Sequence, residues 1–252
     1  MNNQSTIEKM HQMKLYGMVR AFKSTMEVAV KASLTPDEML SHLIDAEWDE
    51  RYNRKLTRLV RDARFRYQAS IEQIDFQLSR NLDKNEILRF SDCGWIRERK
   101  DVIITGPTGA GKSFLATALA HQGCIYGFKV LYMNCAKLLS QLKISKADGT
   151  YVKELAKIQN QDVLVIDDFG LHPFDAQMRL SLLEIMEDRH GKSSTLLASQ
   201  FPVPAWHEII GEPTIADAIC DRIIHHAHRI ELKGESLRKK YTPLVTMPSE
   251  TR

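Results

Sequence analysis

The residues best suited to chemistry in this sequence are three glycines, a lysine and a serine within GPTGAGKSF, which runs from Gly106 to Phe114. They match the pattern G-x-x-x-x-G-K-[ST], with a strand-like apolar run before them and a helix-like run after them. Glycines let backbone N–H groups converge on phosphate oxygens, and the start of a helix adds a partial positive charge there. A plain glycine-rich turn with an exposed lysine would not need this setting. We therefore predict a phosphate-binding loop.

The loop predicts that the protein binds ATP together with Mg²⁺. Lys112 is expected to reach the β and γ phosphates, and Ser113 is expected to offer its hydroxyl to the metal. We expect the whole loop to contact the nucleotide, through Gly106, Pro107, Thr108, Gly109, Ala110, Gly111, Lys112, Ser113 and Phe114.

A second candidate group is the pair of aspartates that ends the apolar run VLVIDD. In a parallel sheet the carboxyl ends of the strands share one edge, so this run delivers Asp167 and Asp168 beside the loop. Two adjacent carboxylates raise each other's pKa unless a cation lies between them, and Mg²⁺ supplies that cation. We expect Asp167 to hold the metal through its water shell and Asp168 to orient the attacking water.

Three polar residues further along the chain complete the candidate catalytic set. The run TLLASQ ends in Gln200, which suits a sensor of the γ-phosphate and the water. Arg222 lies on a predicted helix just before the last predicted strand, and Arg238 lies just after that strand. Arginines at these two places approach the γ-phosphate of a neighbour or of their own chain, although either could be an ordinary surface arginine. If Arg222 acts in trans, the protein must form a homo-oligomer.

From about residue 100 the sequence alternates short β-branched runs with longer helical ones. This pattern is typical of a parallel sheet with helices on both faces. We predict an α/β fold with five strands, over 101–105, 129–134, 163–167, 194–200 and 229–232. Helices are expected over 112–125, 136–142 with a continuation to 158, 175–190 and 214–226.

Residues 1 to about 70 are expected to be helical. Thr35, Pro36 and Glu38 form a capping box at the start of one helix, and no glycine or proline follows until after residue 90. This helix can therefore run far. Within it, residues 51–66 alternate apolar and basic side chains at helical intervals, which predicts an amphipathic helix with one strongly basic side.

Two basic places are candidates for DNA contacts. The formal charge of the chain is only +3, so affinity for nucleic acid must come from local clusters. Contacts from Lys and Arg to phosphates bring affinity without sequence readout, so we expect largely sequence-independent binding of double-stranded DNA. A solvated basic face or a subunit contact is the alternative at both places. The candidates on the basic helix and after the second strand are Arg54, Lys55, Arg58, Arg61, Lys143 and Lys146.

Composition limits the class of protein. With 252 residues, 43% of them hydrophobic, the chain can bury one good core and carry a smaller appendage. Its four cysteines are widely separated and lack metal-ligand spacing, which indicates buried thiols in a reduced, cytoplasmic protein. No apolar run approaches the roughly 18 residues that a membrane helix needs, so we expect no membrane partner.

The blocks GPTGAGKS, VLVIDDFG, STLLASQ and HEIIGEPTIADAICDRIIHHAHRIELKGESLRK make the chain resemble the IstB family. Members of this family are AAA+ ATPase helpers of IS21-type insertion sequences and are similar to DnaC-type helicase loaders. The resemblance implies a regulator of transposition that oligomerises on target DNA, remodels it and recruits or stimulates an IS21-type transposase, with ATP hydrolysis as the switch. A replicative helicase loader, or a DNA-architectural protein with a merely structural nucleotide, are the alternatives.

The resemblance also implies an organisation of the chain. It comprises a helical N-terminal domain over 1–70 for oligomer and DNA contacts, an AAA+ ATPase domain over 71–242 and a tail over 243–252. Gln200 becomes the first sensor, Arg222 the arginine finger and Arg238 the second sensor. About twenty residues follow the last predicted strand, too few for the usual C-terminal helical lid. Asp168 replaces the usual glutamate and is shorter by one bond of about 1.5 Å, so slow hydrolysis is expected.

Overall fold

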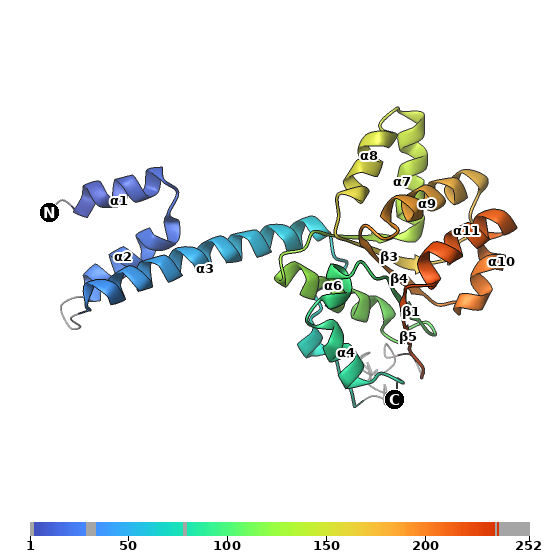
Figure 1. Cartoon of the computed structure of the whole chain (residues 1–252), viewed down its shortest axis with the longest axis horizontal. Coiled ribbons are helices and arrows are strands. Elements are labelled where there is room, and N and C mark those ends of the chain that lie inside the picture. The colour runs from blue at the N-terminus through green and yellow to red at the C-terminus, as the bar shows by residue number, and fades with distance from the viewer. Residues whose placement is uncertain (1–2, 29–33, 78–79, 235, 237–252) are drawn as a thin grey trace, which may run out of the picture. The chain divides into compact units, whose positions relative to one another are not determined.

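The computed structural model describes residues 3–28, 34–77, 80–234 and 236 (Figure 1). The chain divides into two compact units, Met1–Arg58 and Leu59–Arg252. This division lies inside helix α3 (Pro36–Ala63), earlier in the chain than the domain boundary near residue 70 that the sequence suggests. The proposed tail over 243–252 and the second-sensor candidate Arg238 lie outside the described residues.

The N-terminal unit is helical, as predicted. It contains α1 (Asn3–Gln12), α2 (Tyr16–Val28) and most of α3. The predicted capping box is present: the Glu38 backbone N–H donates to Thr35 Oγ1 at 3.3 Å, and the Thr35 N–H donates to Glu38 Oε2 at 2.8 Å. Helix α2 lies close against α3 at Gly17, whose N–H donates to the buried carboxylate of Glu47 at 2.8 Å.

The end of α3 differs from the expectation, which places an amphipathic helix over residues 51–66. The helix stops at Ala63, and Arg64 takes a left-handed conformation with φ of 59°. The side chain of Phe65 then makes edge contacts with the rings of His121 and Tyr132, at centroid distances of 6.2 and 6.3 Å. The helix thus ends, without a local stop signal in the sequence, just before a residue that makes tertiary contacts.

A five-stranded sheet forms the centre of the C-terminal unit. Its strands are β1 (Val102–Thr105), β2 (Val130–Asn134), β3 (Val163–Phe169), β4 (Ser194–Ser199) and β5 (His228–Glu231). The order is β2-β3-β4-β1-β5, and every neighbouring pair is parallel. All five predicted strands are confirmed to within two residues at each end. Because the strands are parallel, their carboxyl ends share one edge of the sheet.

Helices cover both faces of the sheet, as predicted (Figure 1). Helix α6 (Lys112–Ile125) lies on one face, whereas α7 (Cys135–Ala147), α9 (Ala176–Arg189) and α11 (Pro213–Ile224) lie on the other. The predicted continuation of the second helix to residue 158 is a separate helix, α8 (Tyr151–Gln159). Gly149 separates the two with a positive φ of 78°.

Shorter elements complete the described part of this unit. Before β1 the chain forms the 3₁₀ turn η1 (Ile71–Gln73), α4 (Lys84–Phe90) and α5 (Gly94–Arg97). After β4 it forms the 3₁₀ turn η2 (Val203–Ala205) and α10 (Trp206–Ile210). Among the described residues no helix follows β5, and no helix is both long and apolar enough to cross a lipid bilayer.

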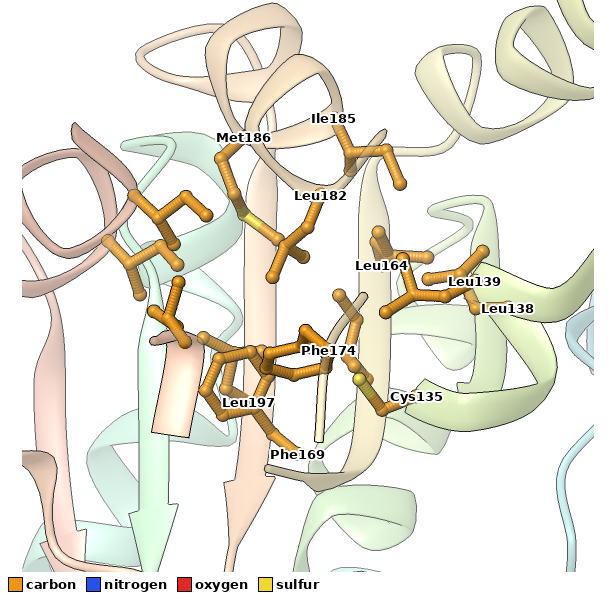
Figure 2. Packing of buried hydrophobic residues seen from close by; sticks show 14 of the residues in the cluster. Cys135, Leu138, Leu139, Leu164, Phe169, Phe174, Leu182, Ile185, Met186 and Leu197 are labelled. Carbon is orange, nitrogen blue, oxygen red and sulfur yellow. The ribbon is translucent and has the colours of Figure 1, made fainter. Parts of the chain in front are cut away.

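The core follows the two-residue period of the strands. Leu164 and Ile166 of β3 and Leu197 of β4 belong to the cluster that packs under α7, α9 and α11 (Figure 2). The intervening residues, such as Val165 and Ala198, are equally buried and face α6. The sheet is therefore covered on both faces, and the side chains at its carboxyl edge are held on a rigid support.

One buried carboxylate links stability to pH. Asp101 Oδ1 accepts a 2.6 Å hydrogen bond from the Thr195 N–H, and burial raises the pKa of Asp101 to about 6. The ordinary pKa of this group is 3.8. At a pH between 3.8 and about 6, the folded chain therefore binds more protons than the unfolded chain. The contribution of Asp101 to stability therefore falls as the pH rises from about 4 to about 6.

We expect Asp101→Asn to remove this part of the pH dependence. The amide oxygen keeps the hydrogen bond from Thr195 but carries no charge that must be buried at neutral pH. Urea unfolding between pH 4 and 7 should show a flatter profile for the variant and a higher free energy of unfolding at pH 7. Substitution of the exposed Asp49 by asparagine is the control, and an equal slope in wild type and Asp101→Asn would contradict the assignment.

Candidate nucleotide site

The glycine-rich loop lies between β1 and α6 at the carboxyl edge of the sheet. Its backbone takes conformations that other residues rarely adopt. At Gly106, with φ of 150°, a Cβ atom would lie 2.4 Å from the Leu232 carbonyl oxygen, and at Gly109, with φ of 83°, it would lie 2.0 Å from Ser236 Oγ. Glycine is thus needed at both positions for the loop to curl over the start of α6.

Lys112 and Ser113 are the first two residues of α6, so they extend from the helix N-terminus into the loop. Lys112 is 9% exposed, and its ammonium donates to the Pro107 carbonyl oxygen at 2.9 Å. This contact holds the cation inside the loop. The partial positive charge of the helix end and the ammonium together make the loop a site for phosphate oxygens.

Ser113 Oγ donates to Asp167 Oδ1 at 2.9 Å. The hydroxyl and the carboxylate come from α6 and β3, and they meet beside the loop as the sequence predicts. Both are hard oxygen donors of the kind that Mg²⁺ prefers, and Mg²⁺ sites use one or two such protein ligands plus phosphate oxygens and water. The two residues therefore fit an Mg²⁺ ion that accompanies ATP.

The two aspartates lie where the pairing of β3 with β4 is irregular. The register shifts between Ile166 and Phe169, and Asp168 has a left-handed φ of 58°. Such bulges re-aim side chains. Asp167 is 1% exposed and accepts a further short hydrogen bond from Tyr132 Oη, whereas the side chain of Asp168 is 33% exposed. The neighbouring carboxylates thus have different surroundings and can serve different roles.

Tyr132 and Asn134, both on β2, complete this acidic site. Burial, followed by the hydrogen bond to Asp167, raises the pKa of Tyr132 well above its ordinary value, so the phenol stays protonated as a donor. Asn134 Nδ2 donates to Asp168 Oδ2 at 2.9 Å while its Oδ1 caps α7 by accepting from the Lys137 N–H. The sequence analysis did not identify either residue, because both reach the site only through the pairing of β2 with β3.

Gln200 follows β4 directly and lies against the loop. Thr108 Oγ1 donates to Gln200 Oε1 at 2.9 Å. The preceding Ser199 is fully buried and donates to the Phe169 carbonyl oxygen at 2.8 Å, which ties the end of β4 to the end of β3. The structure therefore brings the sensor candidate, the loop and the acidic pair together at one edge of the sheet.

Arg222 is not part of this group in the same chain. It lies in the last turn of α11, which leads to the amino end of β5, and the loop lies at the opposite, carboxyl edge. Its guanidinium pairs with Glu187 of α9 at 2.6 Å and donates to the Ala218 carbonyl oxygen at 2.7 Å. Arg222 could therefore meet a triphosphate only from a neighbouring copy.

Several candidate DNA contacts already have partners within their own unit. Arg54 pairs with Glu50 at 3.0 Å, Arg61 with Asp62 at 2.9 Å, and Lys143 with Asp175 at 2.8 Å. Lys146 lies over the Tyr151 ring at 4.4 Å, and Lys55 and Arg58 are exposed. Lys143 and Lys146 both lie on α7.

Two solved structures share this architecture. The DnaC helicase loader matches with a TM-score of 0.54 and 20% identity, over 66% of this chain and 97% of that one. AMPPCP-bound DnaA from Aquifex aeolicus matches with a TM-score of 0.57 and 15% identity, over 70% and 54% of the two chains. At such low identity these likenesses show the fold, which is that of P-loop AAA+ proteins.

Sequence relatives share more than the fold. A Sinorhizobium fredii protein, y4pL, whose name describes an insertion sequence ATP-binding protein, is 43% identical over 93% of this chain and 96% of its own. A Pseudomonas aeruginosa relative from insertion sequence IS21, also named for ATP binding, is 29% identical over 86% and 82%. The sequence model of the IstB-like ATP binding proteins matches residues 8–244. The chain therefore belongs to the family of IstB-like ATP binding proteins.

Proposed function

We propose that this protein is an Mg²⁺-dependent ATPase that assembles on double-stranded DNA when ATP is bound and serves transposition by recruiting the transposase of its insertion sequence. The main support is the contact between Ser113 and Asp167 beside the loop, next to the separately oriented Asp168. A purely structural nucleotide would not require this second, partly exposed carboxylate. The relatives' names add the context of insertion sequences.

Each residue of the site has one task in the proposed hydrolysis. The loop and Lys112 bind the phosphates, and Ser113 and Asp167 would hold Mg²⁺, which neutralises charge on the β and γ phosphates. Asp168 orients a water whose oxygen attacks the γ-phosphorus while the bond to the β–γ bridging oxygen breaks. Gln200 contacts the γ-phosphate and reports its loss. Because aspartate is shorter than the usual glutamate, we expect slow turnover that acts as a timer.

Assembly follows from the position of Arg222 at the sheet edge opposite the loop. A γ-phosphate in one subunit would bind the guanidinium of the next, so ATP joins neighbours and hydrolysis separates them. The exposed basic residues Lys55 and Arg58 would contact DNA phosphates without reading sequence. Bound DNA would then be deformed and presented to the transposase. A pull-down with transposase against replicative helicase separates this role from that of a helicase loader.

The experiment that tests the proposal compares assemblies on a long duplex by electron microscopy with ATP and with ADP. We expect ordered assemblies with ATP that dissolve as it is hydrolysed, and none with ADP. Asp168→Asn should bind ATP as the wild type does, but its rate of phosphate release should fall by about 10²- to 10⁴-fold. Its assemblies on DNA should therefore persist after those of the wild type have dissolved.

Asp83→Asn is the matched control for Asp168→Asn, because Asp83 caps α4 and an amide oxygen can still accept the Asn85 N–H. It should behave as the wild type does in all three measurements. Identical assemblies with ATP and ADP would contradict an ATP-dependent switch. Undiminished phosphate release by Asp168→Asn would contradict the role of that carboxylate.

A further inference from the structure

The C-terminal unit contains a second recess that the nucleotide site does not use. It has a volume of about 570 Å³ and lies between the segment that follows α3 and helix α6. We call it the arginine pocket because three arginines and no carboxylate are among the described residues that line it. Those residues are Val60, Arg61, Arg64, Phe65, Arg66, Tyr67, Gln68, Ala69, Ser70, Gln73 and His121. A recess with this lining favours an anion.

The pocket is built on a fixed turn. Arg64, in its left-handed conformation, and Arg66 flank Phe65, whose ring is held by His121 of α6 and Tyr132 of β2. The anchored ring therefore fixes the backbone from which both guanidinium groups extend. Arg66 is 57% exposed at its side chain, so its guanidinium can move at little cost.

A polar atom on the pocket wall also lacks a partner. His121 Nδ1 is buried and makes no hydrogen bond with any described residue. Burial lowers the pKa of His121, so the ring is neutral at physiological pH. Its Nδ1 can then donate or accept one hydrogen bond, depending on the tautomer. This atom is enclosed by protein, so it adds no donor to the open recess, and the positive charge of the pocket comes from its arginines.

The pocket touches the acidic site through one residue. Arg66 Nη1 lies 3.9 Å from Asp168 Oδ2, the same oxygen that accepts a hydrogen bond from Asn134. Arg66 therefore both lines the arginine pocket and forms a long ion pair with the carboxylate that the proposed hydrolysis needs. If an anion in the pocket draws Arg66 away, then of these two contacts the Asp168 carboxylate keeps only the hydrogen bond from Asn134.

We propose that the arginine pocket binds a phosphate group of a DNA strand, and that Arg66 is shared between this phosphate and Asp168, so that DNA binding releases the carboxylate for hydrolysis. The inference rests on the proposed function, because it needs DNA as the ligand and Asp168 as the group that orients water. Coupling of this kind is reciprocal: if DNA binding loosens Arg66 from Asp168, then loss of the Asp168 charge, with Arg66 intact, must tighten DNA binding.

DNA affinity without nucleotide is the first test, measured as fluorescence anisotropy of a labelled duplex over a range of salt. Arg66→Ala and Arg64→Asn should each weaken binding several-fold and lower the salt slope by about one. Asparagine is chosen at position 64 because it tolerates a left-handed backbone. Asp168→Asn should instead bind DNA several-fold more tightly, because the neutral amide no longer competes for Arg66.

Turnover is the second readout. We expect Arg66→Ala to hydrolyse ATP several-fold faster than the wild type without DNA, and to lose most of its stimulation by DNA. Arg64→Asn should weaken DNA binding but keep full stimulation at saturating DNA. Arg89→Ala, which removes an exposed arginine of α4 outside the pocket, is the control and should change neither quantity.

Inorganic phosphate and pyrophosphate, added as competitors of the duplex, separate two sources of the anion. Weak competition at millimolar concentration supports a phosphodiester of DNA, and displacement at micromolar concentration would overturn the choice of DNA in favour of free phosphate. A wild type that binds no DNA would overturn the proposed function as well. A wild type that binds and assembles on DNA, with Arg66→Ala and Arg64→Asn unchanged in affinity, would overturn this inference alone.

Discussion

With Arg222 replaced by alanine, the protein should bind ATP as tightly as the wild type but release phosphate about 10³- to 10⁵-fold more slowly, the range that a trans-acting arginine contributes elsewhere. The reason is electrostatic: negative charge develops on the γ-phosphate oxygens in the transition state, and a guanidinium from the neighbour stabilises it in a site that excludes water. Phosphate release at saturating ATP and DNA, together with the equilibrium binding of a fluorescent ATP analogue, measures the two halves of this prediction.

The topology of the sheet makes the effect specific to an assembly. Helix α11 ends beside the amino end of β5, and the loop follows the carboxyl end of β1, so the arginine and the loop of one chain lie at opposite sheet edges. In the isolated chain Arg222 pairs with Glu187. Glu187 is itself exposed, so a neighbour's phosphates can replace it as the partner at small cost.

Mixing two inactive variants tests the trans position directly. Lys112→Ala should lose ATP binding because the loop loses its ammonium, yet it still carries Arg222. A mixture of Lys112→Ala and Arg222→Ala should therefore regain turnover at interfaces where an intact loop meets an intact arginine. Arg229→Ala removes an exposed arginine at the start of β5 and serves as the control with near-normal turnover. Failure of the mixture to exceed either variant would exclude action in trans.

Local signals in the sequence were sufficient for the sheet and the loop. The glycines, Lys112 and Ser113 lie within one short motif, and the five strands are short apolar runs whose length and position identify them. Parallel strands then bring the ends of β1, β3 and β4 to one edge without further information, which is why Asp167 and Gln200 could be placed near the loop.

Residues that reach the site through tertiary contacts could not be found in this way. Asn134 and Tyr132 matter because β2 lies next to β3 in the sheet, and strand order is not written in a single sequence. Arg66 reaches Asp168 from the segment after α3, where Phe65 makes edge contacts with the rings of His121 and Tyr132. The local sequence of this segment is that of a continuing helix, so its departure from helix was unpredictable.

A second arginine carries the largest expected effect on stability. Arg189, at the end of α9, is 2% exposed and donates four hydrogen bonds within the C-terminal unit. Its acceptors are Thr195 Oγ1 at 3.2 Å and the carbonyl oxygens of Ile158 at 2.9 Å, Gln161 at 3.0 Å and Ser194 at 2.5 Å. Burial lowers its pKa to about 10, so it remains charged at neutral pH and attracts the nearby carboxylate of Asp101.

Arg189→Ala should lower the free energy of unfolding by about 3–5 kcal/mol. The substitution takes a charged donor away from three carbonyl oxygens and the Thr195 hydroxyl, removes the cation near Asp101 and opens a cavity. The urea midpoint, followed by circular dichroism, measures the loss. Arg189→Met fills most of the volume of the arginine side chain but donates no hydrogen bond, so it should recover only the part of the lost stability that comes from the cavity. Arg89→Ala, at an exposed site, is the control, and its free energy of unfolding should stay within about 0.5 kcal/mol of that of the wild type.

The same substitution should interact with Asp101→Asn. Without the guanidinium, the Asp101 carboxylate loses its neighbouring positive charge, its pKa rises further and the cost of burying its charge at pH 7 grows. At pH 7 the double variant should therefore be less destabilised than the sum of the two single changes in unfolding free energy. This difference should disappear below about pH 4. There Asp101 is protonated in the folded chain and largely protonated in the unfolded chain. Simple additivity at pH 7 would show that Arg189 acts through the carbonyl oxygens alone.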